Sequence, residues 1–536
     1  MAVETLSVSL IARKIQFVLS GRSKGAHFVL LGVLCAVVFF WNLNAAPLFD
    51  RDEGAFSEAT REMFDRDDFV SPFLNGEPRN DKPIFLYWVQ SGGVEIFGMN
   101  EVGVRFSSAL AASLWVFATY FFARRFFSPS IGLAAAFIQA TALFVIIIGR
   151  MATADAWLNL FIALSFFDIY RHFDDAKNNA NSRWSALRVY LWVGLGFLTK
   201  GPIAIAFPFG TALIFGLIKK DFKPLLRLVF NPLGWLVFVG VAAPWYVVQT
   251  MRDGGAFVRE FFLQHNVGRY EHPFDGHAGS FLYYVPVAFL LVLPYCYWLL
   301  RLIGRVGQAR RDPLKLFLWL WFALVFVFFS LSGSKLPHYL LYGMTPVFIM
   351  MAAHRRDFRF GRLLAFSTVI ATLLVLFLLP WILPAAQSYI KNADDIARVA
   401  LTKTAFDPMS QILIGLGLVA TIALLFVPRI KTARLLPVAA LIQTAVLIGI
   451  ILPRVGAVLQ KSTVDAARYL KDNNIENPVV WDIDAPSLSF YRGHTTEWRE
   501  PRPGETAITH LDKLKDAPTA TVLFQEGPIA IVRINQ

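Results

Sequence analysis

Long runs of apolar residues, separated by short polar segments, dominate the chain between residues 27 and 453. A run of about 20 apolar residues is long enough to cross a bilayer as a helix. We therefore predict thirteen membrane spans, near residues 27–43, 103–123, 130–149, 154–170, 187–199, 202–218, 231–249, 281–300, 315–333, 338–353, 361–381, 410–428 and 435–453. The first run ends in FFWNLNAAPLF, a poor signal-peptidase site, so we expect it to remain as the first span.

The charges between these runs predict the orientation of the chain. Every second loop is basic, near residues 124–125, 171–188, 219–227, 301–311, 355–362 and 429–434. Basic loops stay on the cytoplasmic side of a membrane, so residues 1–26 are expected to be cytoplasmic. With thirteen spans, the C-terminus is then expected outside, in the periplasm of a bacterial inner (plasma) membrane.

The outer face is predicted to carry the larger polar segments. Three outer loops are long, at residues 44–102, 250–280 and 382–409, and residues 454–536 change to a soluble pattern. In that last segment STVDAARYLKDNN predicts a capped amphipathic helix, NPVVWDI a strand, and ATVLFQEGPIAIVRI a hairpin. The predicted fold class is a polytopic α-helical membrane protein, with its transmembrane domain at 27–453, periplasmic juxtamembrane helices and a small C-terminal α/β domain.

Composition narrows the class of protein. A hydrophobic fraction of 56% with 50 Phe residues is typical of a membrane protein. The net charge of +13 lies in clusters between apolar runs, so we expect no nucleic-acid partner. Cys35 and Cys296 fall inside predicted spans, which disfavours a disulfide framework or a thiolate metal site. No Walker loop or dinucleotide fingerprint is present, which disfavours an ATP-driven pump and a soluble nucleotide-sugar enzyme.

An acidic segment, LFDRDEGAFSEATREMF at residues 48–64, follows the first span directly. Ala55, Ala59 and Met63 recur every four residues, which predicts a helix at the membrane surface. The adjacent acids Asp52 and Glu53 have two interpretations. They are either a solvated helix start, in which Asp50 or Asp52 caps the helix, or a general base or ligand anchor.

A second acid, Asp155, stands near the outer end of the fourth predicted span. Carboxylates at that depth are costly and usually face a cavity or a partner. The alternative is an interfacial ion pair with Arg150, five residues earlier in the sequence.

Four cations stand in four separate outer loops beside Gly or Pro. They are Lys82 in RNDKPIFLYW, Lys200 in LTKGPIAI, Arg269 in FLQHNVGRYEHPFDGH, and Lys335, followed by His338, in SGSKLPHYLLY. A single lysine can merely extend its ammonium to the interface, but four converging cations would form a phosphate or pyrophosphate site.

These cations and acids together suggest a reaction. A lipid-linked phosphate would donate a sugar, the fixed cations would stabilise the leaving phosphate, and Asp52 or Asp155 would orient or deprotonate the acceptor. The sequence requires no cofactor. A divalent cation stays possible, because histidines (His265, His272, His277) and acids (Glu271, Asp275) cluster in one loop, although their spacing matches no closed tetrahedral site.

The segments FDRDEGAFSEATREM, DKPIFLYW, LTKGPIAIAFP, HNVGRYEHPFDGHAGSFLYYVPV and SGSKLPHYLLYGMTP resemble, in the same order, one family. It is the GT-C membrane glycosyltransferases related to protein O-mannosyltransferases, and within it the bacterial aminoarabinose transferases that modify lipid A. The resemblance implies an inverting transfer of a sugar, 4-amino-4-deoxy-L-arabinose, from undecaprenyl phosphate to lipid A or lipopolysaccharide on the periplasmic face.

The resemblance also implies roles for individual residues. Asp52 matches a catalytic or acceptor-site acid, Glu53 its neighbour and Asp155 a second acid. The residues implied to hold the donor phosphate are Lys82 and Arg269, helped by Lys200 and Lys335. The residues implied to line the cavity are Tyr87, Tyr339, His265 and His338, and a metal, if bound, would use Asp81 and His265.

Alternatives remain at this stage. The acceptor could instead be a protein hydroxyl, a core sugar or O-antigen. A transporter or flippase for a lipid-linked sugar would need charges through the depth of the membrane, whereas here they concentrate at the outer face. An accessory scaffold would leave the four outer cations unexplained. The expected partners are the lipid-linked donor, an envelope glycan and membrane lipids, and the chain is expected to be a monomer.

Overall fold

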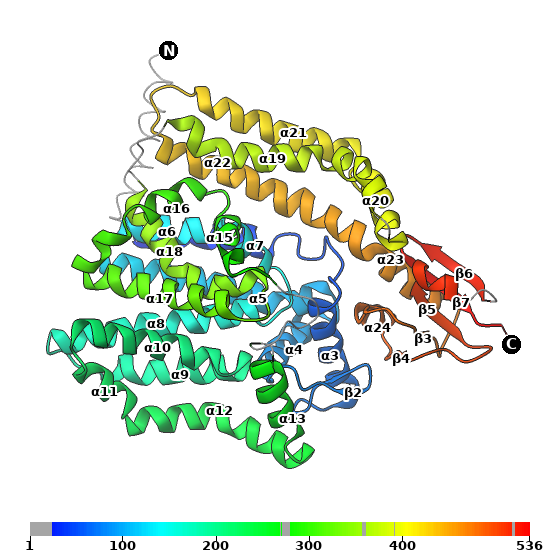
Figure 1. The fold of residues 1–536 in the computed structure, drawn as a ribbon, viewed down its shortest axis with the longest axis horizontal. Coiled ribbons are helices and arrows are strands. Elements are labelled where there is room, and N and C mark those ends of the chain that lie inside the picture. Colours follow the sequence, from blue (N-terminus) through cyan, green and yellow to red (C-terminus); the bar gives the residue numbers. More distant parts are fainter. Residues whose placement is uncertain are drawn as a thin grey trace.

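The computed structural model describes residues 24–268, 270, 279–355, 361–390, 392–516 and 520–535, and it is largely helical. Long helices lie side by side in one body, and a small sheet lies at one end of the molecule (Figure 1). The first half contains α2 (Lys24–Cys35), α3 (Asp52–Arg66), α4 (Phe85–Phe97), α5 (Glu101–Phe126), α6 (Pro129–Ala140), α7 (Leu143–Ile148), α8 (Asp155–Lys177), α9 (Arg183–Lys200), α10 (Ile203–Lys219), α11 (Lys223–Val229), α12 (Pro232–Asp253) and α13 (Ala256–Arg259).

The second half continues the helical body and ends in the sheet domain. Its helices are α15 (Tyr284–Leu291), α16 (Cys296–Ile303), α17 (Pro313–Leu331), α18 (Met344–His354), α19 (Arg362–Ala385), α20 (Ala393–Ala405), α21 (Pro408–Ala423), α22 (Thr432–Val446), α23 (Leu452–Asp472) and α24 (Ser487–Arg492). Short π-helical or 3-10 segments join several of them, including Ala36–Phe40, Glu260–Gly268, Pro337–Gly343 and Leu447–Ile451.

Every one of the thirteen predicted spans overlaps a helix or a pair of consecutive helices. Six helices of the described chain are long and apolar enough to cross a membrane, which makes this a multi-pass membrane protein; the exact number of crossings stays a prediction. Two predicted spans are broken, between α6 and α7 and, at the Leu293–Pro294 bond, between α15 and α16.

The last span differs from its prediction. Helix continues without interruption from Thr432 to Asp472, so the predicted amphipathic helix STVDAARYLKDNN is the end of the final membrane helix. Pro453 lies in the first turn of α23, where the missing N–H costs little because the π-helical turn before it already shifts the hydrogen-bond pattern. The C-terminal domain is therefore joined to the membrane body by a helix.

The C-terminal domain is a five-stranded mixed sheet with the strand order β4-β3-β5-β7-β6. Its strands are β3 (Val479–Val480), β4 (Glu497–Trp498), β5 (Thr506–His510), β6 (Thr521–Glu526) and β7 (Ile529–Arg533). β3 runs parallel to β4 and β5, and β7 runs antiparallel to β5 and β6. The predicted hairpin is β6–β7, turning at Gly527, and the predicted strand is β3.

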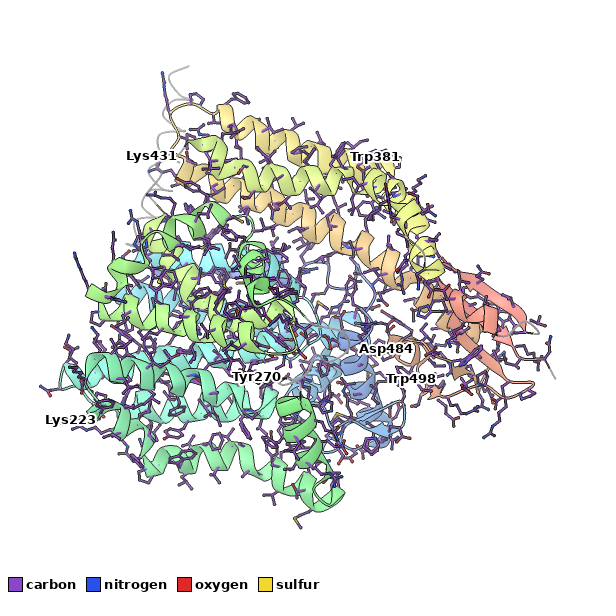
Figure 2. The ribbon with its side chains drawn as sticks, viewed as in Figure 1. Lys223, Tyr270, Trp381, Lys431, Asp484 and Trp498 are labelled. Atoms are coloured by element: carbon purple, nitrogen blue, oxygen red, sulfur yellow. The ribbon has the colours of Figure 1, made fainter. Side chains whose placement is uncertain are left out.

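The two ends of the long helices carry different parts of the chain. Lys223 and Lys431, from predicted cytoplasmic loops, lie at one end, whereas Asp484 and Trp498 of the C-terminal domain lie at the other (Figure 2). α3, α4 and α13 also lie at this second end (Figure 1). The acidic segment and the C-terminal sheet thus share one end of the molecule.

The acidic helix α3 is not a solvated surface helix. Its residues from Glu53 to Met63 are buried, because α3 packs between α4 and α24 of the C-terminal domain. Glu58 forms a buried bidentate pair with Arg61, which also donates to the carbonyl of Gly493 at 3.1 Å. Arg61, held by Glu58, thus links α3 to the C-terminal domain.

Neither Asp50 nor Asp52 caps α3, whose N-cap position is Arg51. The Asp50 carboxylate instead accepts from the backbone N–H of Ser487, at 2.9 Å, in the first turn of α24. Gly54 permits this approach, because a Cβ there would lie 3.0 Å from both the Asp50 carboxylate and the Ser487 nitrogen.

Candidate active site

A short hairpin presents Lys82 beside α3. Its strands are β1 (Phe73–Leu74) and β2 (Glu77–Pro78), and Asn75-Gly76 forms the turn with φ of 53° and 86°. Asn-Gly is favoured there because both turn residues need positive φ. The Gly76 N–H donates to the Glu62 carboxylate at 3.2 Å, so α3 fixes the hairpin and the loop that follows it.

That loop, residues 79–84, holds two cations around one carboxylate. Asp81 lies 3.0 Å from Nε of Arg79 and 3.3 Å from Nζ of Lys82. Burial alone would raise the pKa of Asp81, but the charges of Arg79, Lys82 and His265 outweigh it and hold that pKa well below its usual range. Asp81 is thus a carboxylate, and Arg79, Asp81 and Lys82 together carry one net positive charge.

A second ion pair forms at the ends of three helical segments. Lys200 ends α9 because Gly201, with φ of 76°, stops the helix and Pro202 follows. Its ammonium donates to Asp155, the first residue of α8, at 2.8 Å, and to the Tyr342 hydroxyl at 2.9 Å. The Tyr342 hydroxyl also donates to Asp155, at 2.5 Å.

The alternative pairing of Asp155 with Arg150 is wrong. Arg150 donates to the carbonyls of Val38 and Asn42, both at 2.9 Å, whereas Asp155 pairs with Lys200. Asp155 is buried, and its oxygen Oδ1 accepts two hydrogen bonds. This carboxylate is therefore suited to positioning Lys200 rather than to removing a proton.

A cavity of about 600 Å³, part of it open to solvent, joins the two ion pairs. Its polar lining comes from Asp81, Lys82, Lys200, His265, Ser332, Ser334, Tyr339 and Tyr342, and its apolar lining from Ile203, Phe261, Tyr270, Phe328 and Phe329. Lys200 lies over the rings of Tyr339 and Tyr342, 5.3 and 5.6 Å from their centroids. The 3-10 turn Pro337–Gly343 places these tyrosines three residues apart on one face. The cavity can hold an anion between two lysines.

Asp52 and Glu53 are adjacent but have opposite environments. Asp52 is exposed at the start of α3, and its charge acts on Arg79, Lys200 and His338. Glu53 is fully buried and receives two hydrogen bonds from Arg105, at 2.7 and 2.8 Å, and two from the N–H groups of Phe49 and Ala152. Glu53 thus holds the chain that carries Asp52, and no oxygen of it is left for a substrate.

The remaining predicted residues separate into groups. Lys335 lies outside the cavity lining, because its ammonium donates to the carbonyls of Phe329, Ser330 and Ser332 at the end of α17. Such a lysine caps a helix C-terminus. Tyr87 and His338 are near the site without lining the cavity: the Tyr87 hydroxyl accepts from Arg79 at 3.0 Å, and His338 Nε2 lies 3.9 Å from Asp155.

Two predictions concern the loop after α13. His265 lines the cavity with Asp81, so these two side chains could contribute to a divalent-cation site, although Asp81 is already paired with two cations. Within the described ranges, no group of three or more His, Cys, Asp or Glu residues is arranged to hold a metal ion. Arg269, His272, His277, Glu271 and Asp275 lie outside the described residues.

Sequence reasoning missed Arg79. Its guanidinium contacts Asp81 and Tyr87 and lies over the Phe56 ring, 4.9 Å from the centroid. An available signal was its position three residues before Lys82, in the same loop.

These observations define a class of protein, a multi-pass helical membrane protein with a charged cavity at one end. Residues 81–247 match the family model described as dolichyl-phosphate-mannose-protein mannosyltransferase. The fold is similar to that of ArnT from Cupriavidus metallidurans bound to undecaprenyl phosphate, with a TM-score of 0.76 and 22% identity over 95% of this chain and 98% of that one. An Archaeoglobus fulgidus oligosaccharyltransferase shares the fold more distantly, with a TM-score of 0.52, 14% identity, and coverage of 92% and 70%.

Curated relatives agree with the structural match. The undecaprenyl phosphate-alpha-4-amino-4-deoxy-L-arabinose arabinosyl transferase 1 of Pseudomonas fluorescens is 31% identical over 377 residues, which are 68% of this chain and 65% of that protein. The Yersinia enterocolitica enzyme of the same type is 31% identical over 339 residues, 62% of this chain and 60% of that protein. The chain thus matches somewhat under two thirds of these relatives' length. The resemblance to GT-C glycosyltransferases indicated by the sequence motifs is confirmed.

Proposed function

We propose that this chain is an inverting glycosyltransferase that moves a sugar, 4-amino-4-deoxy-L-arabinose, from undecaprenyl phosphate to lipid A or lipopolysaccharide. It acts in the bacterial inner membrane, with its site on the periplasmic side. The observation that carries this proposal is the cavity between Lys82 and Lys200, beside the exposed carboxylate of Asp52. The activity for which the relatives are named and the undecaprenyl phosphate bound to ArnT support the choice of donor.

The donor phosphate would lie between the two lysines. Lys200 uses two of its three N–H donors on Asp155 and Tyr342, which leaves one for a phosphate oxygen. When the acceptor oxygen attacks C1 of the sugar, the bond from C1 to the phosphate oxygen breaks, and its electron pair leaves with the polyprenyl phosphate. The phosphate charge rises from one to two, and both lysines stabilise that change.

The role of Asp52 depends on the acceptor. A hydroxyl must lose its proton during attack, and Asp52 would accept it as a general base. A phosphate oxygen of lipid A is already anionic and needs no base. In that case Asp52 would hold the cationic amino group of the sugar with its C1 facing the acceptor.

Mass spectrometry of lipid A tests the proposal in cells. A deletion strain is compared with strains complemented by the wild-type gene or by the Asp52→Asn variant. A mass increment of a pentosamine that depends on the wild-type protein is expected. If lipid A is unchanged in all strains, the acceptor is not lipid A, and the same comparison of O-antigen, core sugar and protein glycosylation tests the alternatives.

A further inference from the structure

One edge of the Arg79 guanidinium, between Nη1 and Nη2, is left open by the described residues. A guanidinium carries five N–H donors in a planar fork. Nε of Arg79 donates to the Tyr87 hydroxyl at 3.0 Å, and Nη2 donates to Asp81 at 3.2 Å. Among the residues that the structure describes, Nη1 of Arg79 has no hydrogen-bond partner, and it is not sealed from solvent. The Nη1–Nη2 edge is thus able to bind an anion through two hydrogen bonds.

Arg79 lies on the Asp52 side of the loop and is not among the residues that line the cavity. Arg79 lies over Phe56, which is one helical turn after Asp52 on the same face of α3, and the charge of Asp52 acts on Arg79. Lys82 and Asp81 line the cavity, whereas neither Arg79 nor Asp52 is among its lining residues. The loop therefore presents one cation to the cavity and another beside the candidate acceptor acid.

The loop also has the charge and the rigidity that an anion site needs. Asp81 neutralises only one of the two cations next to it, so the loop keeps one net positive charge. Asn80 fixes the loop from the other side, because its amide donates to the Glu260 carboxylate at 2.9 Å. Arg79 is held by Phe56, Tyr87 and Asp81, so little side-chain entropy is lost when it binds a ligand.

We propose that Arg79 binds an anionic group, of the phosphate type, on the acceptor and so selects acidic acceptors. This inference rests on the proposed function and deepens it by separating two anion sites. Lys82 and Lys200 hold the donor phosphate in the cavity. Arg79 holds the acceptor beside Asp52, where its oxygen can reach the sugar.

Steady-state kinetics with purified full-length protein test this separation. The probes are undecaprenyl-phosphate aminoarabinose as donor and bis-phosphorylated lipid A as acceptor. Arg79→Gln is expected to raise the KM for lipid A by roughly 10- to 100-fold, the effect of losing one charged hydrogen-bonding group. The KM for the donor is expected to stay within about twofold, since Arg79 does not line the cavity. Equal changes in both KM values, or no change in either, would overturn the proposal.

A double variant separates ligand binding from simple neutralisation of Asp81. If Arg79 served only to neutralise Asp81, then Asp81→Asn would restore wild-type kinetics to Arg79→Gln. The proposal predicts that Arg79→Gln/Asp81→Asn folds, with a wild-type Tm, but keeps the raised KM for lipid A. Restoration of that KM would overturn it.

A different variant tests the proposed function separately from the role of Arg79. If Lys82→Ala leaves both the donor KM and the rate of transfer unchanged, the donor site is misplaced and the proposed function falls. If Lys82→Ala is inactive while Arg79→Gln behaves as wild type, the donor site stands and only the acceptor role of Arg79 is lost.

Discussion

Two carboxylates at the outer end of the molecule are both paired with cations, but with different results. Asp81 lies between two cations in a loop, Arg79 and Lys82, so its cluster keeps one net positive charge. Asp155 pairs with one cation, Lys200, and accepts from a neutral tyrosine, so its cluster carries no net charge. The first cluster is therefore suited to attract an anion, and the second is suited to fix the direction of one ammonium.

The largest effect is expected at Lys82, because it is the cation of the Asp81 cluster that lines the cavity. Lys82→Ala should lower transfer by about 10²–10³-fold, the cost of removing one group that stabilises developing charge. The rate is measured as pentosamine transferred to lipid A by purified protein. Lys223→Ala, at the opposite end of the molecule, is the control and should transfer at the wild-type rate (Figure 2). Equal transfer rates in Lys82→Ala and Lys223→Ala would show that the Asp81 cluster is not part of the active site.

The next largest effect is expected for Asp52→Asn. If the acceptor is a hydroxyl that needs a base, the rate of transfer should fall by about 10²–10⁴-fold. If the acceptor is a phosphate, the loss should be smaller and should appear mainly in the KM for the aminosugar donor. The surface variant Asp482→Asn, which changes only an exposed ion pair with Lys513, is the matched control. Wild-type kinetics in Asp52→Asn would exclude both roles.

Breaking the ion pair between Asp155 and Lys200 should lower the stability of the protein as well as the rate of transfer. Asp155→Asn leaves the Lys200 ammonium without its carboxylate, and breaking a buried pair costs about 3–5 kcal/mol. We expect a lower Tm and slower transfer. Adding Lys200→Met should recover the Tm but not the rate, because the donor phosphate then lacks a cation. Recovery of both would show that Lys200 has no part in transfer.

The smallest expected effect concerns Asp50, where the C-terminal domain meets α3. Burial raises the pKa of Asp50 to about 7, despite hydrogen bonds from Ser487 that lower it. A raised carboxyl pKa favours the folded state below the unfolded pKa of 3.8, and this contribution is lost as pH rises through 7. The negative charge of Asp484, in the C-terminal domain, raises the pKa of Asp50 further.

The Tm of wild-type protein should therefore fall more between pH 5 and pH 8 than the Tm of Asp50→Asn, by about the effect of one shifted carboxyl group. Asn cannot ionise but keeps an oxygen for the Ser487 N–H. Parallel Tm profiles for the two proteins would contradict the assignment of this titration to Asp50.

The sequence predicted the elements well where hydrophobic runs decide them. All thirteen apolar runs overlap helices, and the β6–β7 hairpin follows from its alternating pattern and Gly turn. The burial of α3 within the protein was not predicted, because its polar residues are satisfied by partners far away in sequence. Arg61, for example, bonds to Gly493, 432 residues later.

The sequence predicted which cations belong to the candidate site better than it predicted the role of each residue. Lys82 and Lys200 each stand beside a Gly or Pro near a helix boundary, and Asp155 is the first residue of α8. Glu53 could not be separated from Asp52 by sequence, since its partner Arg105 is 52 residues away. Lys335 resembles Lys200 in sequence, but its ammonium donates to carbonyls at the end of the preceding helix, α17.

Binding of undecaprenyl phosphate to purified protein tests the central comparison most directly. The full-length chain is placed in lipid nanodiscs, and its Tm is followed as the lipid is titrated. We predict saturable stabilisation of the wild type, a loss of at least about tenfold in affinity for Lys82→Ala, and wild-type affinity for Arg79→Gln. Wild-type binding by Lys82→Ala would contradict this prediction, because the Lys82 ammonium, which lines the cavity, would then have no part in holding the donor.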